Sequence, residues 1–156
     1  MRGITAPLGP GDVDAIARRQ VALEDDAAER ARQARAPLVV RDTDLVSTVV
    51  YARHYYGACP RWIEEAARAR RAALYLLCDV DVPWKPDPVQ RDGSGADPRE
   101  RAVIRDVFGA VLGEFGCTWR WVRGGWSERA HTAAEAVRAL TGTLPGATGV
   151  RTAGAP

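Results

Sequence analysis

Two apolar runs of the sequence each end in a pair of aspartates. They are LVVRDTD at 38–44 and ALYLLCDVD at 73–81. In an open α/β sheet, ligands bind beyond the carboxyl ends of the strands, where an aspartate can hold Mg²⁺ or accept a substrate proton. An aspartate there can also simply cap the next helix, and Asp44 before Leu45 fits that structural role. Because the pattern occurs twice, both interpretations stay open.

The segment 81–92, DVPWKPDPVQRD, is the second group of residues that could do chemistry. Its prolines stiffen it, and Trp84 can stack on a planar ring. Arg91, together with Arg99 and Arg101, could close over phosphate groups through paired N–H donors. The alternative is a surface loop whose tryptophan covers an edge of the domain.

An aromatic face is expected on the predicted helix that follows Asp44. Tyr51, His54, Tyr55 and Tyr56 share this helix. Such a face usually packs in a core or at its edge, but it can also contact a ligand. We take Tyr51 as a candidate substrate contact.

The elements that would position these residues follow from hydrophobic periodicity and from the Gly and Pro positions. Helices are expected over 13–34, 45–56, 61–71, 98–115 and 127–140, with Ser127 as a cap, and strands over 38–40, 73–78 and 117–122. Continuous apolar strands separated by helices predict an α/β fold with a parallel sheet covered on both faces. We expect one domain over 1–140 and a disordered tail over 141–156, which is rich in Gly, Thr, Ala and Pro.

Composition limits the classes of partner. The 22 basic and 20 acidic residues give a net charge of +2, so nucleic acid is an improbable ligand. No apolar run is long enough to span a membrane, and the start of the sequence lacks a signal-peptide pattern. The three cysteines form no metal-binding or disulfide framework, which favours buried thiols in a reducing cytoplasm.

The runs 42–67, DTDLVSTVVYARHYYGACPRWIEEAA, and 75–92, YLLCDVDVPWKPDPVQRD, carry a family resemblance. With the helix–strand–Gly–helix ending, they resemble the NadR-type P-loop kinases. This group is also described as an AAA-type ATPase or kinase domain and includes ribosylnicotinamide kinases. The resemblance covers about residues 10–140. It implies a three-layer P-loop NTPase-like fold, with phosphoryl transfer from ATP, aided by Mg²⁺, to a small nucleoside-like acceptor.

The resemblance also implies roles by position. Asp42 matches a Walker-B-like acid near Mg²⁺, and Asp44 matches a residue that faces the phosphoryl acceptor. Trp84 and Asp87 match positions that border the acceptor site.

The remaining roles that the resemblance implies concern ATP. Arg91, with Arg99 and Arg101, matches arginines of a lid over the ATP phosphates. Gly124 matches the loop beside the adenine. Positioning and charge neutralisation of this kind are what phosphoryl transfer requires.

The sequence departs from the family by lacking the glycine-rich motif G-x-x-x-x-G-K-[ST]. The strand before that motif would be the shared neighbour of the strands near 40 and 76, so the sheet is expected to be incomplete at its N-terminal part. Either the P-loop lies upstream of this sequence, or the chain is a shortened homologue. We therefore expect an impaired kinase. The alternative is a non-catalytic regulatory or binding module, and a homo-oligomer or a partner chain that supplies the strand stays open.

Overall fold

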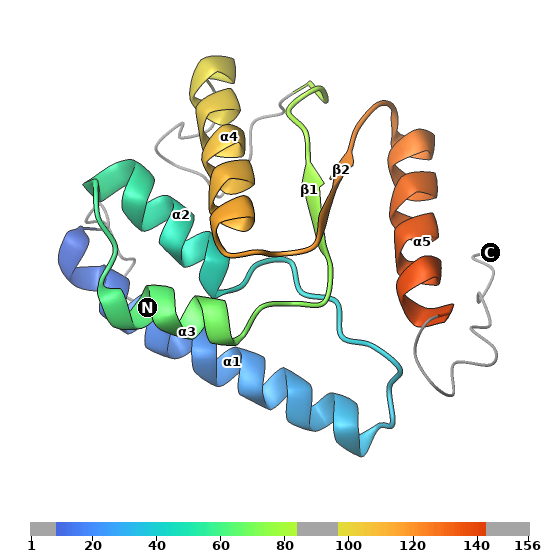
Figure 1. The fold of residues 1–156 in the computed structure, drawn as a ribbon, viewed down its shortest axis with the longest axis horizontal. Helices are drawn as coiled ribbons and strands as arrows, with labels where there is room; N and C mark the ends of the chain where they lie inside the picture. Colours follow the sequence, from blue (N-terminus) through green and yellow to red (C-terminus); the bar gives the residue numbers. More distant parts are fainter. Residues whose placement is uncertain (1–8, 84–96, 143–156) are drawn as a thin grey trace, which may run out of the picture.

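The computed structural model describes residues 9–83 and 97–142, and its elements follow the expected order (Figure 1). A short 3₁₀ turn, η1, covers Pro10–Asp12. The other described elements are α1 Val13–Gln33, α2 Leu45–Tyr56, α3 Arg61–Ala69, β1 Tyr75–Cys78, α4 Pro98–Glu114, β2 Trp119–Val122 and α5 Trp126–Gly142. The five expected helices and two of the three expected strands are therefore confirmed.

Local signals explain where α2 begins and ends. The Asp44 side chain accepts a hydrogen bond from the Val46 N–H at 2.9 Å, which satisfies one of the free donors of the first turn. At the other end Gly57 has φ of 76°, a left-handed conformation that glycine adopts without steric cost. The capping role that the sequence predicts for Asp44 is confirmed.

The start of α5 differs from the prediction. The helix begins at Trp126, so Ser127 lies inside it and the expectation that Ser127 caps the helix is wrong. The Glu128 carboxylate instead accepts a hydrogen bond from the Gly125 N–H at 2.8 Å. A side chain three residues further on thus performs the capping function.

The sheet contains β1 and β2, paired in parallel with Tyr75 opposite Trp119 and Cys78 opposite Val122. Residues 38–40 form no strand and pair with no described strand, so the expectation of a strand there is wrong. The expected three-layer sheet is accordingly not confirmed. The described residues form a mostly helical α/β fold with a small parallel sheet.

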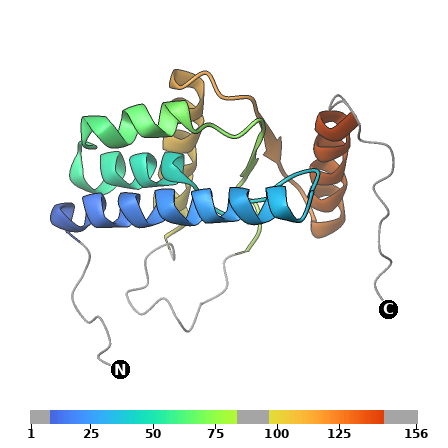
Figure 2. The same cartoon turned by 90° about the horizontal axis from the view of Figure 1, so that it is seen from below.

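The helices surround this sheet unevenly. Figure 1 shows α4 on one side of the two strands and α5 on the other, and Figure 2 shows α1, α2 and α3 lying side by side. The core sits mainly where α2 meets α3 and α4, with Val49, Val50, Ile63 and Leu112 at most 1% exposed. None of the described helices combines the length and the apolar character that a bilayer crossing requires.

A buried carboxylate joins three of these segments. Glu24 on α1 is 2% exposed and accepts a hydrogen bond from the Leu45 N–H at the start of α2. It also forms ion pairs with Arg41 at 3.2 Å and with Arg70, next to the end of α3, at 3.0 Å. Glu24 thus fixes the segment that carries residues 41–45 against α1 and α3.

We expect Glu24→Ala to lower the free energy of unfolding by about 3 kcal/mol, because Arg41 and the Leu45 N–H lose their acceptor and Arg70 loses one of its two acidic partners. Urea denaturation monitored by circular dichroism measures this change. The matched control is Asp26→Ala on the same helix, whose ion pair with Arg30 is exposed on both sides; it should change stability by less than about 0.5 kcal/mol. Equal effects of the two substitutions would contradict the role of Glu24.

Candidate functional site

A cavity of about 600 Å³ lies beyond the carboxyl end of β1, between α2 and α4. Its floor and walls include Leu76, Leu77, Ile104 and Phe108. Three residues selected from the sequence, Asp42, Tyr51 and Arg101, also line it. They come from three separate segments, so the fold brings together part of the predicted site.

Asp44 does not reach this cavity, because both of its carboxylate oxygens are used within the fold. One oxygen caps α2, and the other accepts a hydrogen bond from the Tyr75 hydroxyl at 2.8 Å. The residue is 8% exposed. The structure therefore shows Asp44 in a structural position that links α2 to β1.

Asp79 is held by two arginines. Its carboxylate accepts a hydrogen bond from Arg105 at 2.8 Å and another from Arg123 at 2.7 Å. These donors, with Arg105 contributing most, hold the pKa of Asp79 below its usual range. Both guanidinium groups also lie over the ring of Trp121, at 5.8 Å for Arg105 and 4.4 Å for Arg123 from its centroid. Asp79 thus ties β1 to α4 and to the end of β2.

Asp81 is likewise occupied. It accepts a hydrogen bond from the Gly124 N–H at 2.6 Å and pairs with the buried Arg129. The Gly124 N–H is the largest influence that lowers the pKa of Asp81. The Asp81 carboxylate therefore stabilises the turn between β2 and α5 and does not serve a ligand.

Asp42 differs from these three acids. It is exposed, lines the cavity and makes no hydrogen bond or ion pair with any residue in the described part of the chain. Its negative charge acts on Tyr51. The pKa of the Tyr51 phenol is raised, mainly by burial and to a smaller extent by the Asp42 carboxylate. Of the four strand-end acids, Asp42 is the one that the described structure leaves available for a ligand.

Aromatic rings form one wall of the cavity. Tyr51 and Tyr55 are stacked with ring centroids 6.2 Å apart and an angle of 10° between the planes. Phe108 contacts Tyr51 edge to face at 5.8 Å. A wall of this kind can hold a planar ring by stacking.

Two arginines on α4 line the cavity one helical turn apart. Arg101 makes one long hydrogen bond, at 3.5 Å, to the Val82 carbonyl, whereas Arg105 is bound by Asp79 and Asp106. Arg105 is not among the residues predicted from the sequence, although its position four residues after Arg101 places both on one helix face. Arg101 is the better placed of the two to contact an anion.

Two residues predicted to bind ATP lie outside this cavity lining. Arg99 is exposed at the start of α4, where its backbone N–H donates to Asp97 at 2.8 Å. Gly124 forms the turn after β2 with φ of 83°. Their assignment to nucleotide binding stays a prediction. Trp84, Asp87 and Arg91 lie outside the described residues.

The cysteines also differ from expectation. Cys78 is exposed and lines the cavity, so the prediction of three buried thiols is wrong for this residue. Cys59 and Cys117 are partly buried, and burial raises the pKa of Cys59 to about 11. An exposed cysteine thus lies at the end of β1, among the residues that line the cavity.

The described residues fit Mg²⁺ and ATP only in part. They contain no group of three side chains that could hold a metal ion by themselves. Mg²⁺ usually takes one or two carboxylates together with substrate phosphates, and Asp42 can supply one carboxylate. Arg101 can contact a phosphate, but the sequence contains no glycine-rich phosphate loop. A complete ATP site is therefore not formed by the described residues alone.

Acid should destabilise this region by protonating Asp79 and Asp81, the two carboxylates that are bound by arginines. The pKa values of Asp79 and Asp81 are lowered in the folded state, so their stabilisation is present above pH ~4 and is lost as the pH falls through the folded-state pKa values. We expect the Tm to fall as the pH drops below about 4 and the acid dependence to become shallower in Asp79→Asn. Thermal unfolding across this range measures both effects. An unchanged acid dependence in the variant would contradict the assignment.

The influence of Asp42 on Tyr51 gives a second test of the geometry. Asp42→Asn removes a negative charge beside the phenol, so the pKa of Tyr51 should fall, while burial still keeps it above the ordinary value. Ultraviolet titration, with Tyr51→Phe used to identify the Tyr51 signal, measures the shift. Asp26→Asn, on the remote face of α1, serves as the control. A Tyr51 titration identical in Asp42→Asn and the unmodified chain would contradict the placement of Asp42.

Comparison of the sequence with known proteins identifies a family. No curated protein matches the chain significantly. The sequence model of a family described as an AAA domain, a P-loop NTPase-type family, matches residues 3–129. The match includes α1 to β2 and the cavity residues Asp42, Tyr51 and Arg101. The chain belongs to this AAA-domain family of P-loop NTPase-type proteins.

Proposed function

We propose that this chain is a phosphotransfer domain of the NadR type, which binds a small nucleoside-like acceptor in the cavity between α2 and α4. The phosphoryl donor would be ATP with Mg²⁺, and the reaction would take place in the cytoplasm. The observation that carries the proposal is that Asp42, whose carboxylate makes no hydrogen bond or ion pair with the described residues, lines a cavity with an aromatic wall. Family membership supports nucleotide binding.

The base and the reacting hydroxyl of an acceptor nucleoside would each have a matching group in the cavity. The stacked rings of Tyr51 and Tyr55 offer a surface for a planar base. Asp42 is placed to accept the proton of an acceptor hydroxyl or to hold Mg²⁺ beside it. Because Asp44 is occupied by Tyr75 and by the α2 cap, we assign the acceptor-side role to Asp42.

Arg101 supplies the positive charge of the proposed site. Its guanidinium group lines the same cavity as Asp42 and makes one long hydrogen bond within the described structure. Developing negative charge on a transferred phosphoryl group is stabilised by such a donor. ATP supplies the phosphoryl group when bound, and the chain's own residues orient the acceptor and take its proton.

A second candidate function is a binding or regulatory module without catalysis. It is favoured by the absence of a glycine-rich phosphate loop from this sequence. In this case the cavity would bind the same class of ligand, but no phosphoryl group would be transferred.

Transfer of labelled phosphate from Mg-ATP to ribosylnicotinamide, adenosine and uridine tests the proposal. We expect slow transfer to at least one nucleoside and a decrease of about 100-fold or more in Asp42→Asn, because the proton acceptor is lost. Asp26→Asn, on α1 and away from the cavity, should retain the full rate. The fold of each variant is checked by circular dichroism.

Binding separates the two candidates. Quenching of tyrosine fluorescence by a nucleoside measures occupation of the aromatic wall, with Tyr51→Phe and Tyr51→Ala as variants. Binding without transfer would favour the non-catalytic module over the kinase. If none of the nucleosides binds at millimolar concentration, the assignment of the cavity is wrong for both.

A further inference from the structure

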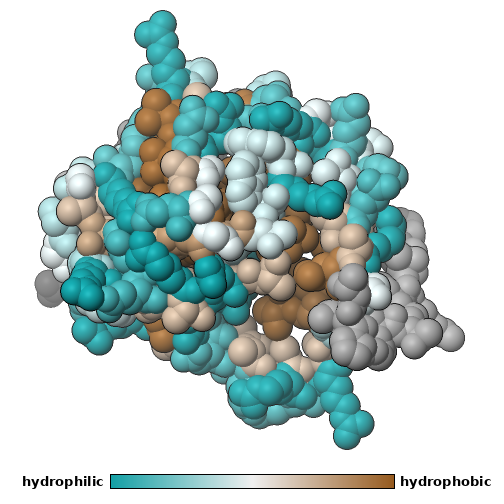
Figure 3. Space-filling model, in the orientation of Figure 1, coloured by the Kyte–Doolittle hydropathy of each residue, from teal (hydrophilic) through white to brown (hydrophobic). Residues whose placement is uncertain are grey.

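The segment that carries Asp42 runs between α1 and a second cavity. This cavity, of about 500 Å³, separates residues 37–44 from β1 and is lined mainly by apolar side chains. Figure 3 shows apolar side chains around the hollow. Residues 37–43 pair with no described strand, and the Tyr75 hydroxyl crosses the cavity to reach Asp44, two residues beyond Asp42. The contacts next to Asp42 itself must therefore come from another side.

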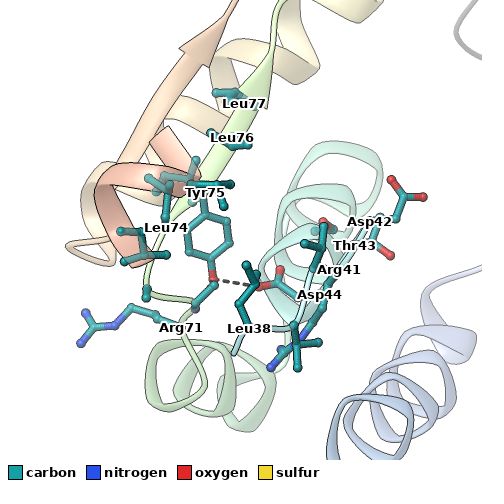
Figure 4. Close-up of a pocket in the computed structure, with 18 of the residues that line it drawn as sticks. Leu38, Arg41, Asp42, Thr43, Asp44, Arg71, Leu74, Tyr75, Leu76 and Leu77 are labelled. Carbon is teal, nitrogen blue, oxygen red and sulfur yellow. Dashed lines mark hydrogen bonds between the residues drawn. The ribbon is translucent and has the colours of Figure 1, made fainter. Parts of the chain in front are cut away.

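The Asp42 side chain does not fix its own position. Figure 4 shows the Asp44 carboxylate directed toward Tyr75 and the Asp42 carboxylate directed away from it. Asp42 makes no hydrogen bond or ion pair with any residue in the described part of the chain. The place of its carboxylate is therefore set by the backbone on either side of it.

Helix α1 holds the residues on both sides of Asp42. Arg41, which precedes it, pairs with the buried Glu24 at 3.2 Å. Thr43, which follows it, accepts a hydrogen bond on its backbone carbonyl from the side-chain amide of Gln20 at 3.1 Å. Gln20 and Glu24 lie one turn apart on the same face of α1. Asp42 thus stands between two residues that are both anchored to this helix.

The Gln20 amide is placed between acceptors. Its nitrogen lies 3.1 Å from the Thr43 carbonyl oxygen and 3.4 Å from the Glu24 Oε1 atom. The same Glu24 oxygen accepts from the Leu45 N–H at 3.1 Å. Because both neighbours of the amide are acceptors, its NH₂ group and not its carbonyl must face them. A neutral side chain with two donors fits this place, and a carboxylate of the same size does not.

We propose that Gln20 is a positioning residue for Asp42, which holds the Thr43 carbonyl on α1 and so fixes where the Asp42 carboxylate lies in the cavity between α2 and α4. The Arg41 contact acts through a long side chain, whereas Gln20 holds the backbone itself. A proton acceptor must lie within hydrogen-bond reach of its donor, and a displacement of about 1 Å can lower a rate about 100-fold. The catalytic consequence rests on the proposed function, but the positioning does not.

NMR relaxation of the backbone amides of Asp42 and Thr43 in the full chain tests the positioning directly. Gln20→Glu keeps the size of the side chain but turns an oxygen toward the Thr43 carbonyl and Glu24. We expect the order parameters of both amides to fall from about 0.85, typical of a rigid backbone, toward about 0.6, typical of a flexible one. Gln20→Ala should have the same direction of effect. Unchanged order parameters in both variants would overturn the proposal.

The matched control lies on the same helix. Gln33 donates to Glu29 at 2.8 Å, four residues before it, and this contact is exposed. Gln33→Glu therefore also adds an acid beside a glutamate on α1, but away from residues 41–43. It should leave the order parameters of Asp42 and Thr43 unchanged. A loss equal to that in Gln20→Glu would overturn the proposal, because it would show a general effect of charge on α1.

A separation of binding from turnover distinguishes positioning from a merely structural role. With a nucleoside that the unmodified chain phosphorylates, Gln20→Glu should lower kcat about tenfold or more. The Kd for that nucleoside, measured by tyrosine fluorescence, should change less than about twofold, because the aromatic wall is retained. A parallel loss of nucleoside binding would overturn the proposal. Absence of transfer by the unmodified chain would contradict the proposed function alone, because the order parameters still decide the role of Gln20.

Discussion

The Glu24 carboxylate receives a backbone N–H from the start of α2 and guanidinium groups from Arg41 and Arg70. These contacts connect α1 with two segments that are distant from it in the sequence. Residues 41–43 pair with no strand, so their position depends on such side-chain contacts, to which the hydrogen bond from Tyr75 to Asp44 adds a further one. The location of Asp42, and with it the candidate site, depends on this one buried charge and on its full set of partners.

The strand-end acids show how a fold can use similar residues in different ways. Asp44, Asp79 and Asp81 each join two elements through hydrogen bonds that hold the carboxylate in the ionised form or cap a helix. The exposed Asp42 has no such contact within the described structure. Availability to a ligand is therefore a property of the three-dimensional contacts, which the repeated sequence pattern does not contain.

The sequence predicts the helices well because each has a local signal, such as the Asp44 cap and Gly57 at the two ends of α2. It fails at 38–40, because a strand also requires a partner and no local pattern specifies one. The role of Glu24 was missed, yet it lies seven residues after the buried Ala17 and so on the same helix face. Asp42, Tyr51 and Arg101, which the sequence singles out, line one cavity, and their functional roles stay predictions. The ion pairs of Asp79 and Asp81 with arginines depend on tertiary contacts that no local pattern specifies.

The cations of the ion pairs in 9–83 and 97–142 are arginines, apart from two histidine contacts. A guanidinium group keeps its proton beyond pH 12, whereas a lysine ammonium loses it near pH 10.4. Burial and the Asp44 carboxylate also raise the pKa of Tyr75, so its hydroxyl remains a donor in base. The contacts that hold α1, α2, α3 and β1 together are thus resistant to alkali, and the cavity keeps its walls where a lysine-based network would have lost its charge.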